Sequence, residues 1–486
     1  MKILISLLII LFSFSSAPAQ GWYTLSNGLN NTVTEIYFVN ENTGWLCGSS
    51  GLVMKSTNGG TNWTQQTSNT FATLWAVFFT DENNGWISGG NGLILSTSNG
   101  GANWTLQSSG TFSDLWYVHF INTSTGWISG SNGEIFKSTN GGANWTLQSS
   151  GTAQVLYSVF FINELTGWVT GNGGVIRKTT NGGTNWFSQS SGTSALLHCV
   201  NFADPANGWI TGFNGIILST TNGGANWSFQ NTGTGVFIRS IDFVNSSTGF
   251  AAGDNGTILA TTNGGINWLM QNSNASSHFY SLMSLNSSTA WASGENGTIR
   301  KTTTGGIVFR HLDLNMLIEG FYNESENNMT ADTISVFLRN SSSPYEIIDS
   351  GKSLTDSLGN ISLLFSNAVN NVNYYITLNH RNSIETWSSI ALMFISDELD
   401  YDFSASASNA YGSNMTLKGT RWAIYSGDVN QDGTTDLADL TVIDNDAGNF
   451  LTGYISSDVN GDGLADISDL GITDNNSYNF VGAVLP

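Results

Sequence analysis

Apolar and polar positions alternate along most of the chain in a unit of 41 residues, which recurs seven times without insertion or deletion. In the second unit, the apolar positions of segment 74–79 predict a first strand. Segments 85–89, 93–96 and 104–107 predict three more, and Asn91-Gly92 predicts a two-residue hairpin turn before the third. Because no helical periodicity interrupts these strands, we expect each unit to be a four-stranded antiparallel blade of a β-propeller.

Two aromatic positions mark every unit. The first follows a glycine in most units and is occupied by Trp45, Trp86, Trp127, Trp168, Trp209, Phe250 and Trp291. The second follows a Gly-Gly pair and is occupied by Trp63, Trp104, Trp145, Trp186, Trp227, Trp268 and Phe309. A repeat this regular indicates one structural unit stacked on copies of itself. We therefore interpret these side chains as packing between blades rather than as a platform for sugars.

The two ends of the repeat array are expected to meet. Trp22 lies 41 residues before Trp63, so segment 22–25 is predicted to be a fourth strand without a blade of its own. In the seventh repeat the turn motif has decayed and the second aromatic position is Phe309. The N-terminal strand is therefore predicted to complete the seventh blade and to close a seven-bladed propeller over residues 20–309.

The turn between the third and fourth strands carries a recurring motif. In the first unit it reads Ser56-Thr57-Asn58-Gly59-Gly60-Thr61-Asn62-Trp63. The motif resembles the Asp-box of bacterial neuraminidase repeats, with asparagine in place of aspartate. The whole unit resembles the repeats of photosystem II assembly-factor-like propellers. An asparagine side chain can still cap such a turn by bonding the backbone, and the resemblance implies a structural hairpin on the face away from the ligand.

Function is expected where the repeats differ, at the head of each first strand. This column contains Thr34, Trp75, Trp116, Tyr157, His198, Arg239 and Tyr280, of which all but Thr34 are ligand-binding candidates. Aromatic side chains with a polar tip suit a sugar or a peptide, which they contact by stacking and hydrogen bonding. The alternative is that the column packs the mouth of the central channel.

Catalysis has weaker support in the sequence. A glycosidase needs two carboxylates, and the best pair is Asp254 and Glu295, which occupy the same turn in adjacent repeats, with Asp242 on an inner strand. Solvated acids are common in turns, and no nucleophile motif, phosphate loop or His/Cys metal cluster is visible. We expect a non-catalytic binding protein. The alternative is an extracellular, polysaccharide-acting glycoside hydrolase that uses the propeller face.

The N-terminus predicts export. Lys2, the apolar segment 3–14 and the small residues of 17–19 form a secretory signal peptide over residues 1–19, with cleavage near Ala19. The protein is therefore expected to be secreted or at the cell surface, with no transmembrane segment in the mature chain. Its formal net charge of −21 argues against nucleic acid as a partner. Both cysteines are expected to be free thiols because they occupy different columns of distant repeats.

The 41-residue repeat does not continue into residues 310–422. Alternating stretches at 333–338, 361–365 and 374–378, separated by turn residues, predict an antiparallel β-sandwich. The polar and aromatic cluster at 380–387 either binds a ligand or satisfies an edge of the sandwich.

Residues 423–486 contain two acidic loops that lie 30 residues apart. The predicted metal ligands of the first loop are Asp428, Asn430, Asp432, Thr434 (by its carbonyl), Asp436 and Asp439. Those of the second are Asp458, Asn460, Asp462, Leu464 (by its carbonyl), Asp466 and Asp469. Oxygen ligands at positions 1, 3, 5, 7, 9 and 12, with glycine at the bend, are the set that Ca²⁺ takes in a loop of this kind. The sequence therefore predicts two Ca²⁺ sites.

The duplicated loops, from Gly427 to Phe480, resemble a type I dockerin. The resemblance implies a small α-helical calcium module that docks onto a cohesin-like protein. The segments after the loops lack lysine and arginine, and positions 10 and 11 are Leu437-Ala438 and Ile467-Ser468. A stabilising or surface-docking role for the bound Ca²⁺ fits these residues as well. The partner is thus expected to be a protein or an extracellular glycan.

Overall fold

The computed structural model of the protein describes residues 21–486, and the predicted signal peptide lies outside them. The described chain divides between Ile307 and Val308 into two compact parts, which we name the propeller unit and the C-terminal unit. Within the described residues, no helix is long and apolar enough to cross a membrane.

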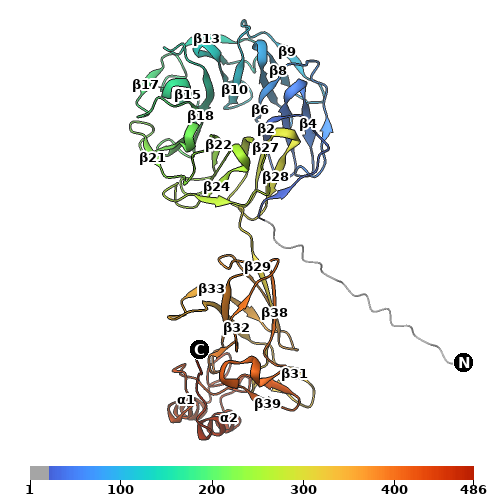
Figure 1. The fold of residues 1–486 in the computed structure, drawn as a ribbon, viewed down its shortest axis with the longest axis vertical. Coiled ribbons are helices and arrows are strands. Elements are labelled where there is room, and N and C mark those ends of the chain that lie inside the picture. The colour runs from blue at the N-terminus through green and yellow to red at the C-terminus, as the bar shows by residue number, and fades with distance from the viewer. Residues whose placement is uncertain (1–20) are drawn as a thin grey trace, which may run out of the picture. The chain divides into compact units, whose positions relative to one another are not determined.

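The propeller unit contains seven four-stranded antiparallel sheets arranged as blades in a ring (Figure 1). Blade 1 contains β2 (Val33–Phe38), β3 (Gly44–Gly48), β4 (Val53–Ser56) and β5 (Thr64–Gln65). Blade 2 contains β6 (Leu74–Phe79), β7 (Gly85–Gly89), β8 (Ile94–Thr97) and β9 (Thr105–Gln107). Blade 3 contains β10 (Leu115–Phe120), β11 (Gly126–Gly130), β12 (Glu134–Ser138) and β13 (Thr146–Ser149). Blade 4 contains β14 (Leu156–Phe161), β15 (Gly167–Gly171), β16 (Ile176–Thr179) and β17 (Phe187–Gln189).

The remaining blades follow the same order. Blade 5 contains β18 (Leu197–Phe202), β19 (Gly208–Gly212), β20 (Ile217–Thr220) and β21 (Ser228–Gln230). Blade 6 contains β22 (Ile238–Phe243), β23 (Gly249–Gly253), β24 (Ile258–Thr261) and β25 (Leu269–Gln271). Blade 7 contains β26 (Phe279–Ser284), β27 (Ala290–Gly294), β28 (Ile299–Thr302) and β1 (Tyr23–Thr24). The prediction of seven four-stranded units is confirmed.

A short 3₁₀ turn joins the second and third strands of every blade. These turns are η1 (Ser49–Gly51), η2 (Gly90–Gly92), η3 (Ser131–Gly133), η4 (Asn172–Gly174), η5 (Phe213–Gly215), η6 (Asp254–Gly256) and η7 (Glu295–Gly297). In η2, Asn91 and Gly92 adopt φ values of 57° and 74°, the left-handed region that asparagine and glycine tolerate. The turn takes three residues rather than the predicted two, because Gly90 belongs to it.

The ring is closed by the N-terminal strand, as predicted. Strand β1 pairs antiparallel with β28, which places Tyr23 opposite Lys301 and Thr24 opposite Arg300. The adjacent Trp22 is 1% exposed, and Phe309 belongs to no strand. The first strand of the described chain therefore supplies the fourth strand of the last blade.

The two aromatic positions pack one blade on the next. The ring of Trp45 stacks on Phe79 of the following blade with 3.5 Å between centroids. Trp104 meets Phe79 of its own blade edge-on at 5.8 Å and donates through Nε1 to Gln66 of the preceding blade at 3.3 Å. The Asp-box turn is a hydrogen-bonded hairpin in which the Asn58 side chain accepts the Asn62 N–H at 2.8 Å. Both motifs are structural, as their interpretation predicted.

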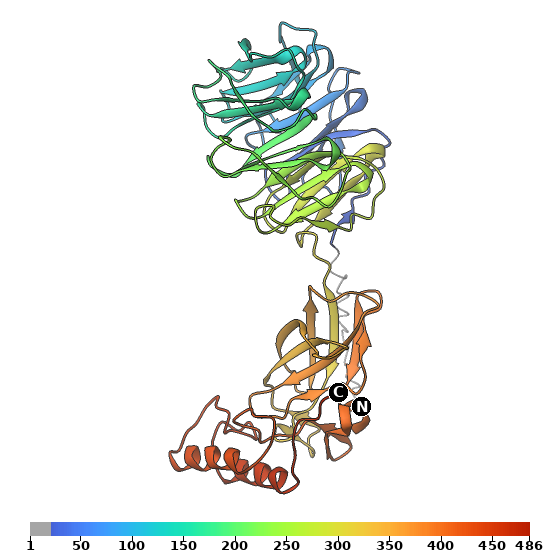
Figure 2. The same ribbon diagram turned by 60° about the vertical axis from the view of Figure 1, so that its left-hand side comes forward.

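The C-terminal unit contains two larger sheets, two hairpins and two helices (Figure 2). The first larger sheet has the order β33 (Ile347–Leu354), β32 (Thr333–Asn340), β35 (Asn373–Asn379) and β36 (Thr386–Trp387), with β37 (Leu392–Met393) also on β35. The second has the order β34 (Asn360–Phe365), β29 (Arg310–Asn315) and β38 (Glu398–Asp402). The hairpins are β30 (Tyr322–Asn323) with β31 (Asn328–Met329), and β39 (Thr416–Lys418) with β40 (Arg421–Ala423).

The two larger sheets share one apolar core, to which β29, β32, β34 and β35 all contribute. Strands β29 and β38 run parallel, so the prediction that this segment is purely antiparallel was wrong. Parallel neighbours need a long connection, and here most of the other strands of the unit lie between the two partners in sequence.

The C-terminal unit also contains two short 3₁₀ turns and two α-helices. These are η8 (Ala407–Asn409), η9 (Tyr411–Ser413), α1 (Leu437–Gly448) and α2 (Ile467–Tyr478). Each helix follows one acidic loop, and the two helices contact each other. Asp436 and Asp466 cap the two helices, each within a capping box.

Candidate functional site

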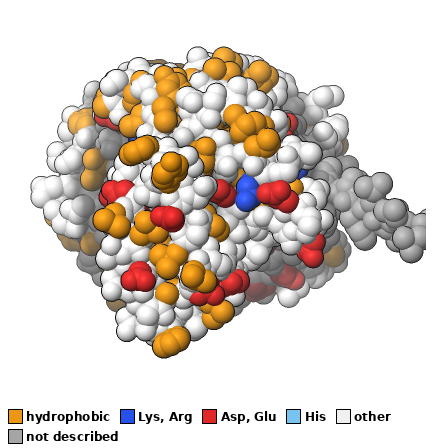
Figure 3. All heavy atoms as spheres, turned by 90° about the horizontal axis from the view of Figure 1, so that it is seen from below, with side chains coloured by type: hydrophobic (Ala, Val, Ile, Leu, Met, Phe, Trp, Pro, Cys, Tyr) orange, Lys and Arg blue, Asp and Glu red, His pale blue; other side chains and the backbone are white. Residues whose placement is uncertain are grey.

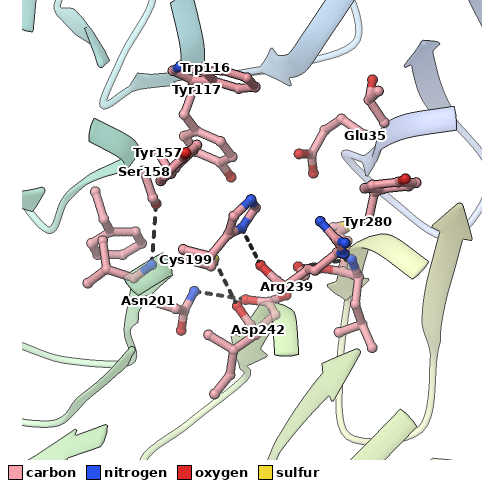
Figure 4. A pocket seen from close by; sticks show the side chains of 18 of the residues that line it. Glu35, Trp116, Tyr117, Tyr157, Ser158, Cys199, Asn201, Arg239, Asp242 and Tyr280 are labelled. Atoms are coloured by element: carbon pink, nitrogen blue, oxygen red, sulfur yellow. Dashed lines mark hydrogen bonds between the residues drawn. The ribbon is translucent and has the colours of Figure 1, made fainter. Parts of the chain in front are cut away.

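A cavity of about 550 Å³ lies among the first strands of the blades. Every member of the column predicted from the sequence lines it, and Figure 4 shows several of these side chains around its open centre. They are Thr34, Trp75, Trp116, Tyr157, His198, Arg239 and Tyr280. The structure therefore brings together all the ligand-binding candidates at one site.

The aromatic members of this column form an arc over blades 2 to 5, which we name the upper tier. Successive ring centroids lie 4.6 Å apart for Trp75 and Trp116, 5.2 Å for Trp116 and Tyr157, and 5.3 Å for Tyr157 and His198. Ring contacts at these distances are favourable and hold each ring in place. The rings therefore pack on one another and also line the cavity.

Arg239 follows His198 in the column, on blade 6, and its charge is neutralised. Its Nε donates to Asp254 at 2.6 Å, and its guanidinium lies 4.4 Å from the ring centroid of Phe237 and 4.8 Å from that of Tyr280. Tyr280 Oη donates to Glu295 at 3.1 Å. The two weak catalytic candidates, Asp254 and Glu295, thus hold neighbouring side chains, and neither is among the described residues that line the cavity.

Two further carboxyl groups, those of Glu35 and Asp242, line the cavity. Asp242 was noted from the sequence only as an acid on an inner strand, and Glu35 was not a predicted site residue. Glu35 accepts the Ser281 hydroxyl at 2.6 Å. Asp242 accepts three hydrogen bonds, from the backbone N–H and hydroxyl of Ser284 and from Asn201 Nδ2. Burial raises the pKa of Glu35 to about 8, with a further contribution from Asp242.

A β-bulge explains why these groups were missed. In every blade the register of the first and second strands shifts just after the start of the first strand, for example between Leu74 and Ala76. The extra residue changes which side chains face the cavity. Counting alternate positions from Trp75 selects the buried Val77, whereas Phe78 is the residue that lines the cavity. Asp242 occupies the same repeat position as Phe78, in a later blade. Residues at this position vary between the repeats, and this variation could have identified Asp242 from the sequence.

The histidines of the cavity are uncharged at neutral pH. Burial lowers the pKa of both His119 and His198 to about 4. His119 Nε2 lies 3.0 Å from the Phe161 carbonyl oxygen, and His198 Nδ1 lies 2.7 Å from that of Arg239. Among the described residues that line the cavity, Arg239 is therefore the only cation, and Asp254 already balances its charge.

In each predicted calcium loop, the first aspartate accepts a hydrogen bond from the backbone of the glycine at the bend. Asp428 Oδ2 accepts the Gly433 N–H at 3.2 Å, and Asp458 Oδ2 accepts the Gly463 N–H at the same distance. The second oxygen of each of these carboxylates is buried and has no hydrogen-bond partner among the described residues. Burial, with Asp439 nearby, raises the pKa of Asp428 to about 6.

The last ligand position of each loop is engaged by the backbone. Asp439 accepts the Val429 and Asn430 N–H groups, and Asp469 accepts the equivalent pair in the second loop. Within residues 21–486, no group of three or more His, Cys, Asp or Glu side chains is gathered closely enough to hold a metal ion. The oxygen-only donor set and the two unpartnered buried oxygens nevertheless fit a hard cation such as Ca²⁺.

The two loops differ in their surroundings. Arg381 Nη2 lies 3.4 Å from Asp458, and Asn382 Nδ2 donates to the Asp458 carbonyl at 2.8 Å. Among the described residues, no basic side chain pairs with Asp428. In the part of the chain that the structure describes, only the second loop is in contact with a basic side chain, that of Arg381 in the turn between β35 and β36.

Comparison with known proteins matches the repeats to one family. The family model described as Photosynthesis system II assembly factor YCF48 matches residues 14–108, 107–191 and 230–352, more than half of the chain. No curated protein matches the chain. Since the similar solved structures below are at most 20% identical, they indicate the propeller fold alone.

Three solved structures illustrate this similarity. "YCF48 bound to D1 peptide" is 20% identical, with a TM-score of 0.52, over 58% of this chain and 95% of that one. "YCF48 from Cyanidioschyzon merolae" is 19% identical, with a TM-score of 0.50, over 58% and 98%. A streptogramin B lyase is 16% identical, with a TM-score of 0.50, over 58% and 97%.

Proposed function

Because the chain belongs to the photosynthesis system II assembly factor YCF48 family, we propose that it is an exported, non-catalytic binding protein whose cavity receives a segment of polypeptide. The observation that carries this proposal is the convergence of the variable column on one cavity. Its volume is within the usual range of ligand sites, and its large rings combine apolar surface with polar tips. One similar solved structure is of a YCF48 protein with a bound peptide, which favours polypeptide over glycan.

Export is proposed from the N-terminal segment. The apolar stretch 3–14 and the small residues before Gln20 have the composition of a cleaved signal. Sequencing the N-terminus of the protein recovered outside the cytoplasm tests this point. We expect the mature chain to begin at Gln20, and an intact Met1 in that material would contradict the proposal.

Peptide binding can be tested without knowing the natural ligand. The probe is a randomised pool of ten-residue peptides with blocked termini, incubated with the immobilised full chain and read by mass spectrometry. We expect the wild type to retain a subset of the pool and the Trp75→Ala/Trp116→Ala variant to lose it. Leu106→Ala is the matched control, because Leu106 is a 68% exposed apolar residue that does not line the cavity. Equal retention by all three proteins would place binding elsewhere, and no retention by any would refute the function.

One observation favours the alternative function, a polysaccharide-acting glycoside hydrolase. A carboxyl group with a raised pKa beside a second carboxylate is what general acid catalysis needs, and Glu35 and Asp242 provide such a pair. Both line the cavity, whereas the pair suggested by the sequence does not. Release of reducing ends from soluble polysaccharides by the wild type, and its loss in Glu35→Gln, would favour this alternative.

For the C-terminal unit we propose two Ca²⁺ sites in a dockerin-like arrangement, one in each acidic loop. The ligands are the six predicted positions of each loop, from Asp428 to Asp439 and from Asp458 to Asp469. The support is the buried, unpartnered oxygen on the first aspartate of each loop. Bound Ca²⁺ would neutralise the crowded carboxylates and stabilise the loops. Calorimetric titration of the full chain should show two sites, of which Asp428→Ala and Asp458→Ala each remove one.

The same segment offers a surface for a protein partner. Leu437 and Ile467 occupy the same position in the two loop–helix repeats and are 74% and 83% exposed. Phe450 and Phe480 follow the two helices and are 87% and 93% exposed. A duplicated set of exposed apolar side chains is typical of an interaction site. This supports docking onto a cohesin-like protein, whereas the Asn476 to Glu319 hydrogen bond at 2.7 Å supports a role in stabilising the unit.

A further inference from the structure

The cavity contains a carboxyl group without a cationic partner. Glu35 accepts one hydrogen bond, from Ser281 on blade 7, and no lysine, arginine or charged histidine within residues 21–486 pairs with it. A buried carboxylate is costly unless a positive charge or several donors offset it. Asp242 differs because three protein donors already satisfy it. Glu35 is therefore the carboxyl group of the cavity for which a ligand can supply the missing partner.

Figure 4 shows the Glu35 carboxyl group directed toward the open centre of the cavity. Tyr117 from blade 3 also lines this centre, and Tyr37 lies two residues from Glu35 on β2. Burial raises the pKa of both phenols, so their hydroxyls stay neutral and can accept hydrogen bonds. The cavity is thus lined by a carboxyl group and two phenols, and the one cation among the described residues that line it, Arg239, is already paired.

A second arc of aromatic rings, the lower tier, runs below the first along blades 1 to 4. Its ring centroids lie 4.9 Å apart for Tyr37 and Phe78, 5.0 Å for Phe78 and His119, and 5.1 Å for His119 and Phe160. Each of these rings lines the cavity. Aromatic rings attract cations, and the attraction increases when water is excluded. The lower tier is therefore a wall that favours a positively charged group beside Glu35.

From these contacts we infer that the cavity binds the cationic end of a lysine or arginine side chain of the polypeptide, with the Glu35 carboxylate as its counter-ion. This inference rests on the proposed peptide-binding function and names the residue type that the cavity selects. Arg239 does not compete for the carboxylate, because it pairs with Asp254. The net charge of −21 also attracts basic ligands over longer distances. Figure 3 views the protein from the end of the C-terminal unit, and acidic side chains outnumber basic ones on that face, which is not the face of the cavity.

The experiment uses three peptide pools with blocked termini and a central lysine, arginine or norleucine between randomised flanks. Norleucine keeps the apolar length of lysine and removes its charge. Each pool is incubated with the wild-type chain, with Glu35→Gln and with Glu41→Gln, and the retained fraction is measured by mass spectrometry. Gln can still accept the Ser281 hydrogen bond, and Glu41 is an exposed acid outside the cavity, so it controls for net charge.

We expect wild type and Glu41→Gln to retain the lysine or arginine pool about tenfold more than the norleucine pool, as for a charge contact of ordinary strength. Glu35→Gln should lose most of this preference and keep only the part that the rings of the lower tier provide. Equal retention by the wild type would overturn the inference while leaving peptide binding intact. Retention of none of the pools would instead contradict the proposed function itself.

The pH dependence gives a second readout. Glu35 must lose its proton to pair with a cation, so lysine-pool retention by the wild type should rise between pH 6 and about pH 8, the pKa of Glu35. The other titratable groups around it are Asp242, Tyr37, Tyr117, Cys47 and Cys199, whose pKa values are all raised by burial. Retention by Glu35→Gln should not change over this range, and a parallel rise in both proteins would contradict the assignment to Glu35.

Discussion

The backbone of Tyr23 pairs with that of Lys301, so the first strand of the described chain completes the last blade of the propeller. Beside this pair, Trp22 packs edge-on against Phe250 of blade 6, with 6.1 Å between ring centroids. Leu25 continues the contact through its N–H, which donates to the Ile299 carbonyl at 3.1 Å. The ring is therefore held shut by a short segment that is remote in sequence from its partner.

Deleting residues 20–30 should open the ring. The loss of the Trp22 side chain alone is worth about 3–5 kcal/mol, and the exposed edge of β28 invites aggregation. We expect a lower melting temperature and concentration-dependent aggregation, measured by differential scanning calorimetry and light scattering. The control is Phe71→Ala, which also removes a large apolar side chain, but one that is 92% exposed and packs against little of the protein. A deletion variant that melts with the wild type would refute the closure.

Both cysteines should remain thiols in the native protein. Cys47 and Cys199 are free in the structure, and burial raises the pKa of both, which lowers the thiolate fraction. Cys47 is 0% exposed, so it should react with a thiol reagent only after unfolding. Mass spectrometry after alkylation with and without denaturant measures this. An intrachain disulfide would contradict the placement of the two blades.

The repeat made the propeller predictable, because seven copies of one pattern specify the strands, their order and the closing strand from Trp22. The same comparison located the upper tier, since Trp75 and its equivalents vary while their neighbours stay apolar. Glu35 was not identified, because a β-bulge shifts the alternation within each first strand. The alternation of apolar and polar residues within one strand does not reveal where such a bulge occurs.

The C-terminal unit was less predictable. Short alternating stretches predicted strands, and most of these are present, but a pattern of period two does not reveal the direction of a neighbour. The parallel pairing of β29 and β38 depends on contacts distant in sequence. The two acidic loops were recognisable because their spacing is local. The contact of Arg381 with the second loop was not, because this residue lies 77 positions before Asp458.

That contact predicts two unequal Ca²⁺ sites. The Arg381 guanidinium near Asp458 repels a cation and occupies one carboxylate oxygen, whereas Asp428 has no such neighbour within residues 21–486. In calorimetric titrations of the full chain, we expect Asp458→Ala to retain the tighter site and Asp428→Ala the weaker one. Arg381→Gln should bring the two affinities closer together. Equal affinities in the two aspartate variants would show that the arginine has no effect on the second loop.

Glu35 should make the stability of the protein depend on pH. Its pKa rises from an ordinary 4.5 to about 8 on folding, so the folded state binds a proton that the unfolded state has lost in this range. Stability from this group is therefore greatest below pH 4.5 and falls as pH rises toward 8, by at most about 1.4 kcal/mol per pH unit. Urea unfolding at pH 5, 6.5 and 8 measures the slope. Glu35→Gln should be less steep than the wild type and than Glu41→Gln, and three parallel curves would contradict the buried state of Glu35.

The central claim is that the upper tier forms the binding site for a polypeptide segment. The most direct test is calorimetric titration of one peptide, isolated from the randomised pool, into the wild type, Trp75→Ala/Trp116→Ala and Leu106→Ala. The claim predicts equal affinities for the wild type and Leu106→Ala, and at least about a tenfold loss in the double variant, since two aromatic contacts are removed. Undiminished binding by the double variant, with its fold verified by circular dichroism, would contradict the claim.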